Sequence, residues 1–569
     1  MAGGGREVVT LQLGHFAGFV GAHWWNLQDA ALDPEGPGEL CPHVQFRSGR
    51  TPRGRDALTP RLILMDLKGS LSSLPRDATT EQSRQAPLAW QGSVSTHREE
   101  PPARPPDLRD PPRADAGART APSPRRPLAG SAPGDGPRVW SDVLRVPLHP
   151  RSVCLVRQFN HDGDTGRLEA FGQGERLLAG PRYAEELEDR LHFFVEECDC
   201  LQGFQVLCDV HDGFAGVGAR AAELLRDEYP GRGILTWGLC PPPPRSGPQP
   251  PGVYRLLNTA LSLVPLAAHS SLLCPLTLAG GLGLRPPPPP TFPLLHYEAA
   301  DPNHSSAILA AALDTVTVPY RLRSAPACMT DLAALLCAAG RKVTGASVAL
   351  PFPLAPGRTL PDALSRLGAA APWTPLSARA EEAGAGGSFA QSVVLRGVEP
   401  DRQTGRLPPG TAPPSALHAA ASGDEVLARY LQRLQPGVTS VSQLLRQPCP
   451  VPPTFPRLFS SRLSARGLVL DRPRVGPAVA AVPVLAGLQS WRGLGRALRG
   501  LAGELARVDV RRWASYLGAG VERDDVAETV HALRALAGCY PRADGADDGE
   551  DDDREGDDDD DGDPGGSPE

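Results

Sequence analysis

Three glycine-rich segments in the N-terminal half of the chain could bind phosphate, two of them after an apolar strand and one after Phe171. They are Gly14-His-Phe-Ala-Gly18-Phe-Val-Gly21, Gly172-Gln-Gly174 and Gly213-Phe-Ala-Gly216-Val-Gly218. Glycine lets a backbone turn tightly against an anion, and the helix that follows presents free N–H groups to it. One such turn alone also occurs without any ligand. Three on one side of a sheet favour an ancestral nucleotide site.

The elements that would position these turns alternate between apolar strands and helices. Strands are expected at 8–13, 61–66, 152–159, 205–210 and 233–238, and helices at 22–27, 183–200 and 218–229. Near-continuous apolar strands between helices predict an α/β fold with a parallel sheet covered on both faces. Ligands of such sheets bind at the carboxyl ends of the strands, where the glycine turns are expected.

Composition marks the breaks between the folded pieces. The 569 residues include 63 prolines and 61 glycines, and the proline runs lie in expected linkers and surface insertions. Residues 75–137 are rich in Pro, Arg, Ser and Gly and predict a disordered insertion. Pro286–Pro290 is a rigid extended run, and residues 375–425 are poorly patterned.

The charge distribution argues against nucleic-acid binding. The net charge is −7, but the stretch from Asp544 to Asp563 holds fourteen acidic residues and one arginine, so the rest of the chain is mildly basic. We expect this acidic tail to be disordered. Basic residues do not cluster as they do in nucleic-acid binders.

The cysteines and the apolar segments indicate in which cellular compartment we expect the protein. Eleven cysteines, an odd number spread over the whole chain, indicate reduced thiols in an intracellular protein. The most apolar stretch, Leu256–Leu273, is interrupted by Asn258, Pro265 and His269. We therefore expect no transmembrane segment, so that any membrane association is peripheral.

Several motifs resemble the tubulin superfamily. The third turn keeps a GxxGxG skeleton where tubulins have GGGTGSG, and it lies between Glu197–Gln205 and Asp227–Pro230, which also resemble tubulin. The first turn, Leu64–Leu67 and Gly172–Gly180 are similar to three further nucleotide loops. Later matches are Thr315–Arg321, Met329–Pro353, Arg512–Gly520 and Asp524–Ala527. Within the superfamily, Gly14–Asn26, Asn160–Gly163 and Val210–Gly213 resemble the misato family.

The resemblance implies a tubulin-like α/β fold divided into six segments. These are the first part of the N-terminal domain (1–74), the disordered insertion (75–137), the remainder of that domain (138–320), an intermediate α+β domain (321–480), C-terminal helices (481–541) and the acidic tail (542–569). It also implies vestigial phosphate-binding residues, which are Gly14, Gly18, Gly21, Asp66, Gly172, Gly174, Gly213, Gly216 and Gly218.

The side chains that tubulin chemistry needs are replaced. Lys68 stands where tubulins carry an acid that helps to hold Mg²⁺, and a cation cannot ligate a hard metal ion. His15, Glu175 and Arg176 replace amides of the phosphate loops, and Leu278 aligns with the asparagine that reads guanine. In tubulin polymers, GTP hydrolysis depends on an acid that the next subunit supplies. That acid aligns with Ala310 in this chain, and Asp314 lies one helical turn too far along to replace it.

The resemblance therefore implies a non-catalytic protein that regulates mitochondrial distribution, morphology and network formation or fusion. It would act from the cytosol and the outer mitochondrial membrane, through proteins of that surface or of the cytoskeleton. We expect no catalytic residues, no metal and no required cofactor, while GTP or GDP bound without turnover stays open. Two alternatives remain, which are an assembly GTPase of the tubulin/FtsZ type and an assembly factor for tubulin or other cytoskeletal clients.

Other constellations have simpler interpretations. His161-Asp162 and His211-Asp212 suggest metal ligands, but each precedes a glycine and fits a turn in which Asp bonds its own backbone. Cys198-x-Cys200 is too closely spaced for a usual zinc site and fits a helix-end core position. Trp24 and Trp25 fit the core better than an exposed patch.

Overall fold

The computed structural model describes the chain at residues 6–32, 38–50, 56–71, 137, 139–161, 166–243, 252–324, 326–368, 371–377, 387–405 and 412–541. Of the expected disordered insertion, only Pro137 is described, and the acidic tail lies outside these residues.

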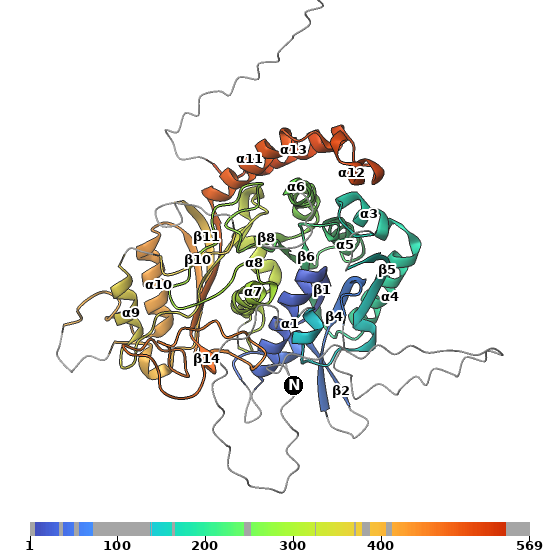
Figure 1. Ribbon diagram of the computed structural model, residues 1–569. Helices are drawn as coiled ribbons and strands as arrows, with labels where there is room; N and C mark the ends of the chain where they lie inside the picture. The colour runs from blue at the N-terminus through green and yellow to red at the C-terminus, as the bar shows by residue number, and fades with distance from the viewer. Residues whose placement is uncertain are drawn as a thin grey trace, which may run out of the picture.

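A six-stranded parallel sheet forms the centre of the first half of the molecule (Figure 1). Its strand order is β5-β4-β1-β6-β7-β8, and each neighbouring pair is parallel. The strands are β1 (Glu7–Leu13), β4 (Leu62–Lys68), β5 (Val153–Asn160), β6 (Leu201–Asp209), β7 (Gly233–Leu239) and β8 (Leu272–Leu276). The predicted α/β fold is confirmed.

Helices cover both faces of this sheet, as the continuous apolar strands predict. Leu207 and Trp237 pack on one side with α1 (His15–Ala30), α2 (Trp140–Val143) and α7 (Pro302–Val316). Val206 and Cys208 pack on the other with α4 (Pro181–Glu196) and α5 (Phe214–Glu228). Next to α5 lie α3 (Phe171–Ala179) and α6 (Gly252–His269).

A second, mixed sheet follows, with the order β10-β9-β15-β11-β12. Its strands are β9 (Gly345–Ala349), β10 (Thr374–Pro375), β11 (Ser388–Arg396), β12 (Thr439–Leu445) and β15 (Val484–Trp491). Helices α9 (Leu360–Leu367) and α10 (Gly423–Leu434) pack on one face of it. Helix α7 packs on the other, between the two sheets. The short helix α8 (Met329–Leu336) contacts both β7 and β11.

The described residues of the region 375–425 contain more regular structure than its composition suggested. Strand β11 lies inside it and pairs with both β12 and β15. The segment reads Ser-Phe-Ala-Gln-Ser-Val-Val-Leu-Arg, and only its second half is continuously apolar. Its alanine- and glycine-rich flank hid the strand. Strand β15 shows that the second sheet also extends past residue 480.

Three helices close the described chain, namely α11 (Arg492–Ala506), α12 (Ala514–Gly518) and α13 (Arg523–Gly538). Figure 1 shows them in red along one side of the molecule, where α11 and α13 pack on α6. The remaining strands are short, and comprise β2 (Phe46–Arg50), β3 (Asp56–Pro60), β13 (Cys449–Pro450) and β14 (Ala481–Val482). Among the described helices, none has both the length and the hydrophobicity that a membrane span requires.

Candidate functional site

A cavity of about 460 Å³ lies at the carboxyl ends of β4 and β6 and the N-terminus of α1. Histidines, carboxylates and two arginines line it together with Phe16, Phe19 and Phe214. The sequence analysis predicted an ancestral nucleotide site at this edge of the sheet. Of the nine predicted phosphate-binding residues, Asp66 contributes to the cavity wall and the eight glycines do not.

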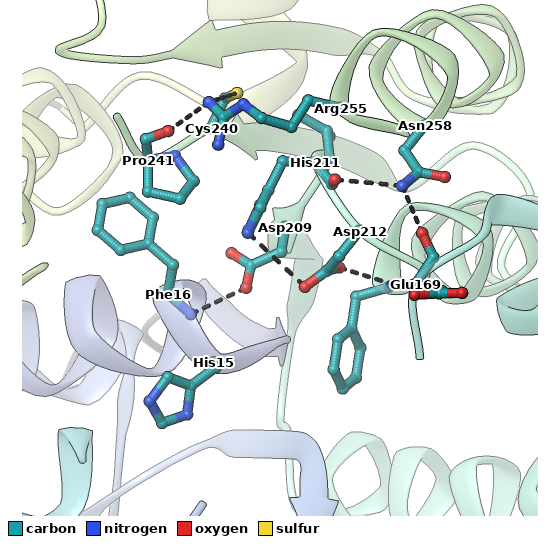
Figure 2. A network of polar contacts seen from close by, with 12 residues as sticks. His15, Phe16, Glu169, Asp209, His211, Asp212, Cys240, Pro241, Arg255 and Asn258 are labelled. Atoms are coloured by element: carbon teal, nitrogen blue, oxygen red, sulfur yellow. Dashed lines mark hydrogen bonds and ion pairs between the residues drawn. The ribbon is translucent and has the colours of Figure 1, made fainter. Parts of the chain in front are cut away.

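The N-terminus of α1 is occupied by a carboxylate of the chain itself. Asp209, the last residue of β6, accepts hydrogen bonds from the backbone amides of Phe16 and Ala17, both at 2.8 Å (Figure 2). Gly14 precedes the helix with a φ of 115°, and a Cβ there would lie 2.4 Å from the Asp209 carboxylate. The first glycine turn therefore admits the Asp209 carboxyl group at the place where a phosphate would sit.

Asp66 is held at the end of β4 by three donors. Its carboxylate faces His15 Nδ1 at 3.1 Å and accepts hydrogen bonds from Trp140 Nε1 at 2.8 Å and from the Leu67 amide at 2.7 Å. Burial alone would raise the pKa of Asp66, but the hydrogen bond and charge of His15, with the other donors, outweigh burial and lower that pKa. Asp66 is therefore an ionised structural anchor for His15 and Trp140.

His211 and Asp212 lie on the loop between β6 and α5. Asp212 accepts the Phe214 amide at 2.9 Å, which is the turn that the sequence predicted. Its other oxygen lies 3.7 Å from His211 Nε2. Burial raises the pKa of Asp212 to about 7, while burial and then the charge of Arg255 lower the pKa of His211 to about 3. Burial and the Asp212 charge also raise the pKa of Asp209.

Asn258 of α6 connects the loops around the cavity, and the sequence analysis did not identify it. Its side-chain oxygen accepts from the Phe171 amide at 2.8 Å and from the Tyr516 hydroxyl at 2.7 Å. Its side-chain nitrogen donates to the carbonyls of Glu169 at 2.7 Å and His211 at 3.1 Å. These four bonds use the whole capacity of the amide, so Asn258 has nothing left for a ligand. An isolated Asn in an apolar helix was the available signal.

The glycines of the first segment mostly lie inside a helix, not in a turn. Helix α1 begins at His15, earlier than predicted, and therefore includes Gly18 and Gly21. A Cβ on Gly18 would lie 2.6 Å from the Trp140 ring, and one on Gly21 would lie 1.8 Å from the Gln12 side chain. Both glycines let the buried helix pack closely against its neighbours. In the sequence, glycines needed for this packing have the same spacing as glycines of a phosphate-binding loop.

The second and third segments are also helical. Gly172 and Gly174 lie in α3, and Gly216 and Gly218 lie in α5, with Gly213 at its N-cap. The turns expected at 172–174 and 216–218 are therefore corrected to helix. A Cβ on Gly174 would lie 1.9 Å from the Gly213 carbonyl oxygen, and one on Gly216 would lie 2.0 Å from that of Phe171. These glycines allow α3 and α5 to touch backbone to backbone.

The remaining tight contacts follow the same rule. A Cβ on Gly172 would lie 2.7 Å from the Ala519 carbonyl oxygen, and one on Gly218 would lie 2.2 Å from Cys208 Sγ. On Gly213 it would lie 2.6 Å from Leu168 Cγ. Whether any of the eight glycines ever approached a phosphate stays a prediction.

Of the replaced tubulin positions, His15 lines the cavity and the others do not. Lys68 is exposed and Leu278 is buried in the core, and neither lines the cavity. Arg176 donates to the Gly518 carbonyl at 2.6 Å, next to α12. Ala310 is fully buried in α7, so a side chain at that position could not reach a neighbouring chain.

Asp314 has a structural role on α7. Its carboxylate lies 2.8 Å from Arg321 Nη2 and 2.5 Å from Arg396 Nη1, and all three side chains are buried. Burial opposes ionisation of Asp314, but the two guanidinium groups outweigh it and lower the pKa. The pair with Arg396 joins α7 to β11, and so links the helix between the sheets to the second sheet.

The core interpretation of Trp24 and Trp25 is confirmed, the turn interpretation is confirmed at Asp212 only, and the interpretation of Cys198 and Cys200 is wrong in part. Trp24 and Trp25 are fully buried, with ring centroids 4.7 Å apart, as expected for core residues. Cys198 is partly buried beyond the end of α4, but Cys200 is exposed and not in the core. The His161 ring packs against the His15 ring, with centroids 3.7 Å apart and an interplanar angle of 32°, whereas Asp162 lies outside the described residues.

The cavity does not fit the guanine nucleotide that the fold implies. Its lining holds four carboxylates and only two guanidinium groups. The α1 amides are already bonded to Asp209, and the Phe214 side chain projects from the third glycine segment into the wall. A triphosphate would find the Phe16 and Ala17 amides already bonded to Asp209, and the ionised Asp66 carboxylate in the cavity wall would repel it.

The fold and this site define a tubulin-like protein. Residues 131–322 match the Tubulin domain model, and residues 6–109 match the Misato Segment II tubulin-like domain model. The chain is also 56% identical to Protein misato homolog 1 of Homo sapiens, over 96% of this chain and 100% of that protein.

Two further relatives carry the same name. The identity is 56% to Protein misato homolog 1 of Bos taurus and 57% to that of Mus musculus, in each case over 96% of this chain and 99% of the relative. The chain belongs to the misato family.

Proposed function

We propose that this chain is a tubulin-like protein without GTPase activity, which acts through contacts with other proteins. One observation carries the proposal. The Asp209 carboxylate holds the amides of Phe16 and Ala17, which a bound phosphate would need. Phosphoryl transfer depends on phosphates held in position, and the Asp209 carboxyl group already occupies the two amides that would hold them.

The surroundings support the same proposal. Lys68 stands where tubulins carry the acid that helps to hold Mg²⁺. Its side chain is exposed and does not line the cavity, so this position offers no metal ligand there. The buried position of Ala310 leaves no route by which α7 of one copy could deliver a catalytic group from there to another. Both points weigh against the alternative of an assembly GTPase.

We further propose that the protein regulates mitochondrial distribution, morphology and network formation or fusion, from the cytosol and the outer mitochondrial surface. Support comes from the membership of the misato family and its expected role. Proteins of that surface or of the cytoskeleton are the proposed partners, and attachment to the membrane is proposed to be peripheral.

The test replaces the endogenous protein in cells by wild type or by Lys68→Ala and images the mitochondrial network. Lys68 is exposed, so the substitution leaves the core intact. Both chains should restore a normal network, and neither purified chain should hydrolyse GTP above background. Hydrolysis by wild type that Lys68→Ala abolishes, together with failed rescue, would contradict the proposal.

A further inference from the structure

Three potential metal ligands meet at the end of β6. They are Asp209, His211 and Asp212, whose ligand atoms all lie within 4.8 Å of one another. Figure 2 shows the two carboxylates and the imidazole pointing toward one another next to the N-terminus of α1. We propose that these three side chains bind a divalent first-row transition cation, without a nucleotide. This proposal goes beyond the proposed function and does not depend on it.

The three side chains retain coordination capacity. Each Asp209 oxygen accepts one backbone amide, and a carboxylate oxygen has a second lone pair for a metal. One Asp212 oxygen holds the Phe214 amide, whereas the other faces His211 Nε2 at 3.7 Å, beyond hydrogen-bond distance. Nδ1 of His211 is buried without a hydrogen-bond partner among the described residues. Nε2 of His211 therefore remains available to a cation.

Electrostatics also favour a cation here. Asp209 is buried, and its ligand atom lies within 4.8 Å of those of Asp212 and His211, so a cation among them would take the place of a proton shared by two neighbouring carboxyl groups. The nearby Arg255 guanidinium donates instead to Cys240 Sγ at 3.2 Å and to the Pro241 carbonyl. The cavity thus has an excess of carboxylates and space for water on the open side of the cluster.

The ligand types select the cation. Two carboxylates and one imidazole suit Mn²⁺ or Zn²⁺ better than Mg²⁺, which prefers an all-oxygen shell. Three protein ligands leave coordination positions that water from the cavity can fill. Asp66 is not needed as a ligand, because His15 and Trp140 already hold its carboxylate.

The experiment titrates metal-stripped, nucleotide-free full-length chain with MnCl₂ and follows free Mn²⁺ by electron paramagnetic resonance. The acidic tail is the same in every variant and contributes the same Mn²⁺ binding to each. Binding at the proposed site is therefore measured as the Mn²⁺ bound by wild type minus the Mn²⁺ bound by His211→Gln. We expect one tight site in wild type that weakens at least about tenfold in His211→Gln and in Asp212→Asn. Asp212→Asn keeps an oxygen for the Phe214 amide, and circular dichroism confirms that each variant folds.

His192→Gln is the matched control, because His192 is an exposed histidine of α4 outside the cavity. It should bind Mn²⁺ as wild type does. Identical isotherms for wild type, His211→Gln and Asp212→Asn would overturn the proposal. A tight site that forms only when GTP is added would overturn both this proposal and the proposed function, whereas loss of this site alone leaves the proposed function standing.

Discussion

Asp314 should be among the most sensitive positions in the molecule. Its carboxylate neutralises Arg321 and Arg396, whose side chains are 4% and 0% exposed. In Asp314→Asn both guanidinium groups stay buried without their counter-ion. Arg396 would keep only neutral partners, the carbonyls of Gln447 at 3.3 Å and Pro448 at 3.0 Å. Removing one partner of a buried ion pair costs about 3–5 kcal/mol, so we expect a loss of this size in the free energy of unfolding.

The assay is urea unfolding of the full-length chain, followed by tryptophan fluorescence. Asp509→Asn is the control, because Asp509 pairs with Arg511 at the surface, where ion pairs contribute about 0–1 kcal/mol. A third variant replaces Asp314, Arg321 and Arg396 together by Leu, Met and Met. It should recover much of the loss, since no unpaired charge remains. A loss below about 1 kcal/mol in Asp314→Asn would refute the reasoning.

Two further predictions concern packing and pH. Gly174→Ala places a methyl group against the Gly213 carbonyl and should destabilise the fold by about 1–3 kcal/mol, whereas Gly503→Ala, in open space on α11, should be neutral or stabilising by up to about 1 kcal/mol. Equal melting temperatures for the two variants would contradict the packing role of Gly174. Burial lowers the pKa of His23 to about 4, so the unfolded chain takes up a proton below about pH 6.5 that the folded chain refuses until about pH 4. The free energy of unfolding should therefore fall by about 3 kcal/mol between pH 6.5 and pH 4. His23→Gln, whose amide can still donate to Asn303, should remove that part of the pH dependence. Urea unfolding midpoints of both chains at pH 7 and pH 4 measure it. An unchanged pH dependence in the variant would exclude His23 as its source.

The sequence predicted the sheet better than the site. Parallel strands buried on both faces are continuous apolar runs, so β1 and β6 were recognisable within a few residues of their ends. Strand β11 was missed because its flanks resemble a linker. The motif resemblance then gave the family, because similar short motifs recur in the same order along the chain.

The site depended on contacts that no local pattern encodes. Asp209 and the α1 amides are more than 190 residues apart in the chain, and only the parallel pairing of β1 with β6 brings them together. Glycines at a helix contact, such as Gly216 against Phe171, have the same spacing as glycines in a phosphate loop. Sequence spacing could not separate the two uses, because both require the absence of a side chain.

The central claim is that an internal carboxylate has taken the place of a nucleotide phosphate. Mass spectrometry of the small molecules released by heat from gently purified full-length protein tests it most directly. The account predicts no guanine nucleotide in stoichiometric amount. One equivalent of GTP or GDP per chain would contradict it, because the amides of Phe16 and Ala17 could not serve Asp209 and a phosphate at once.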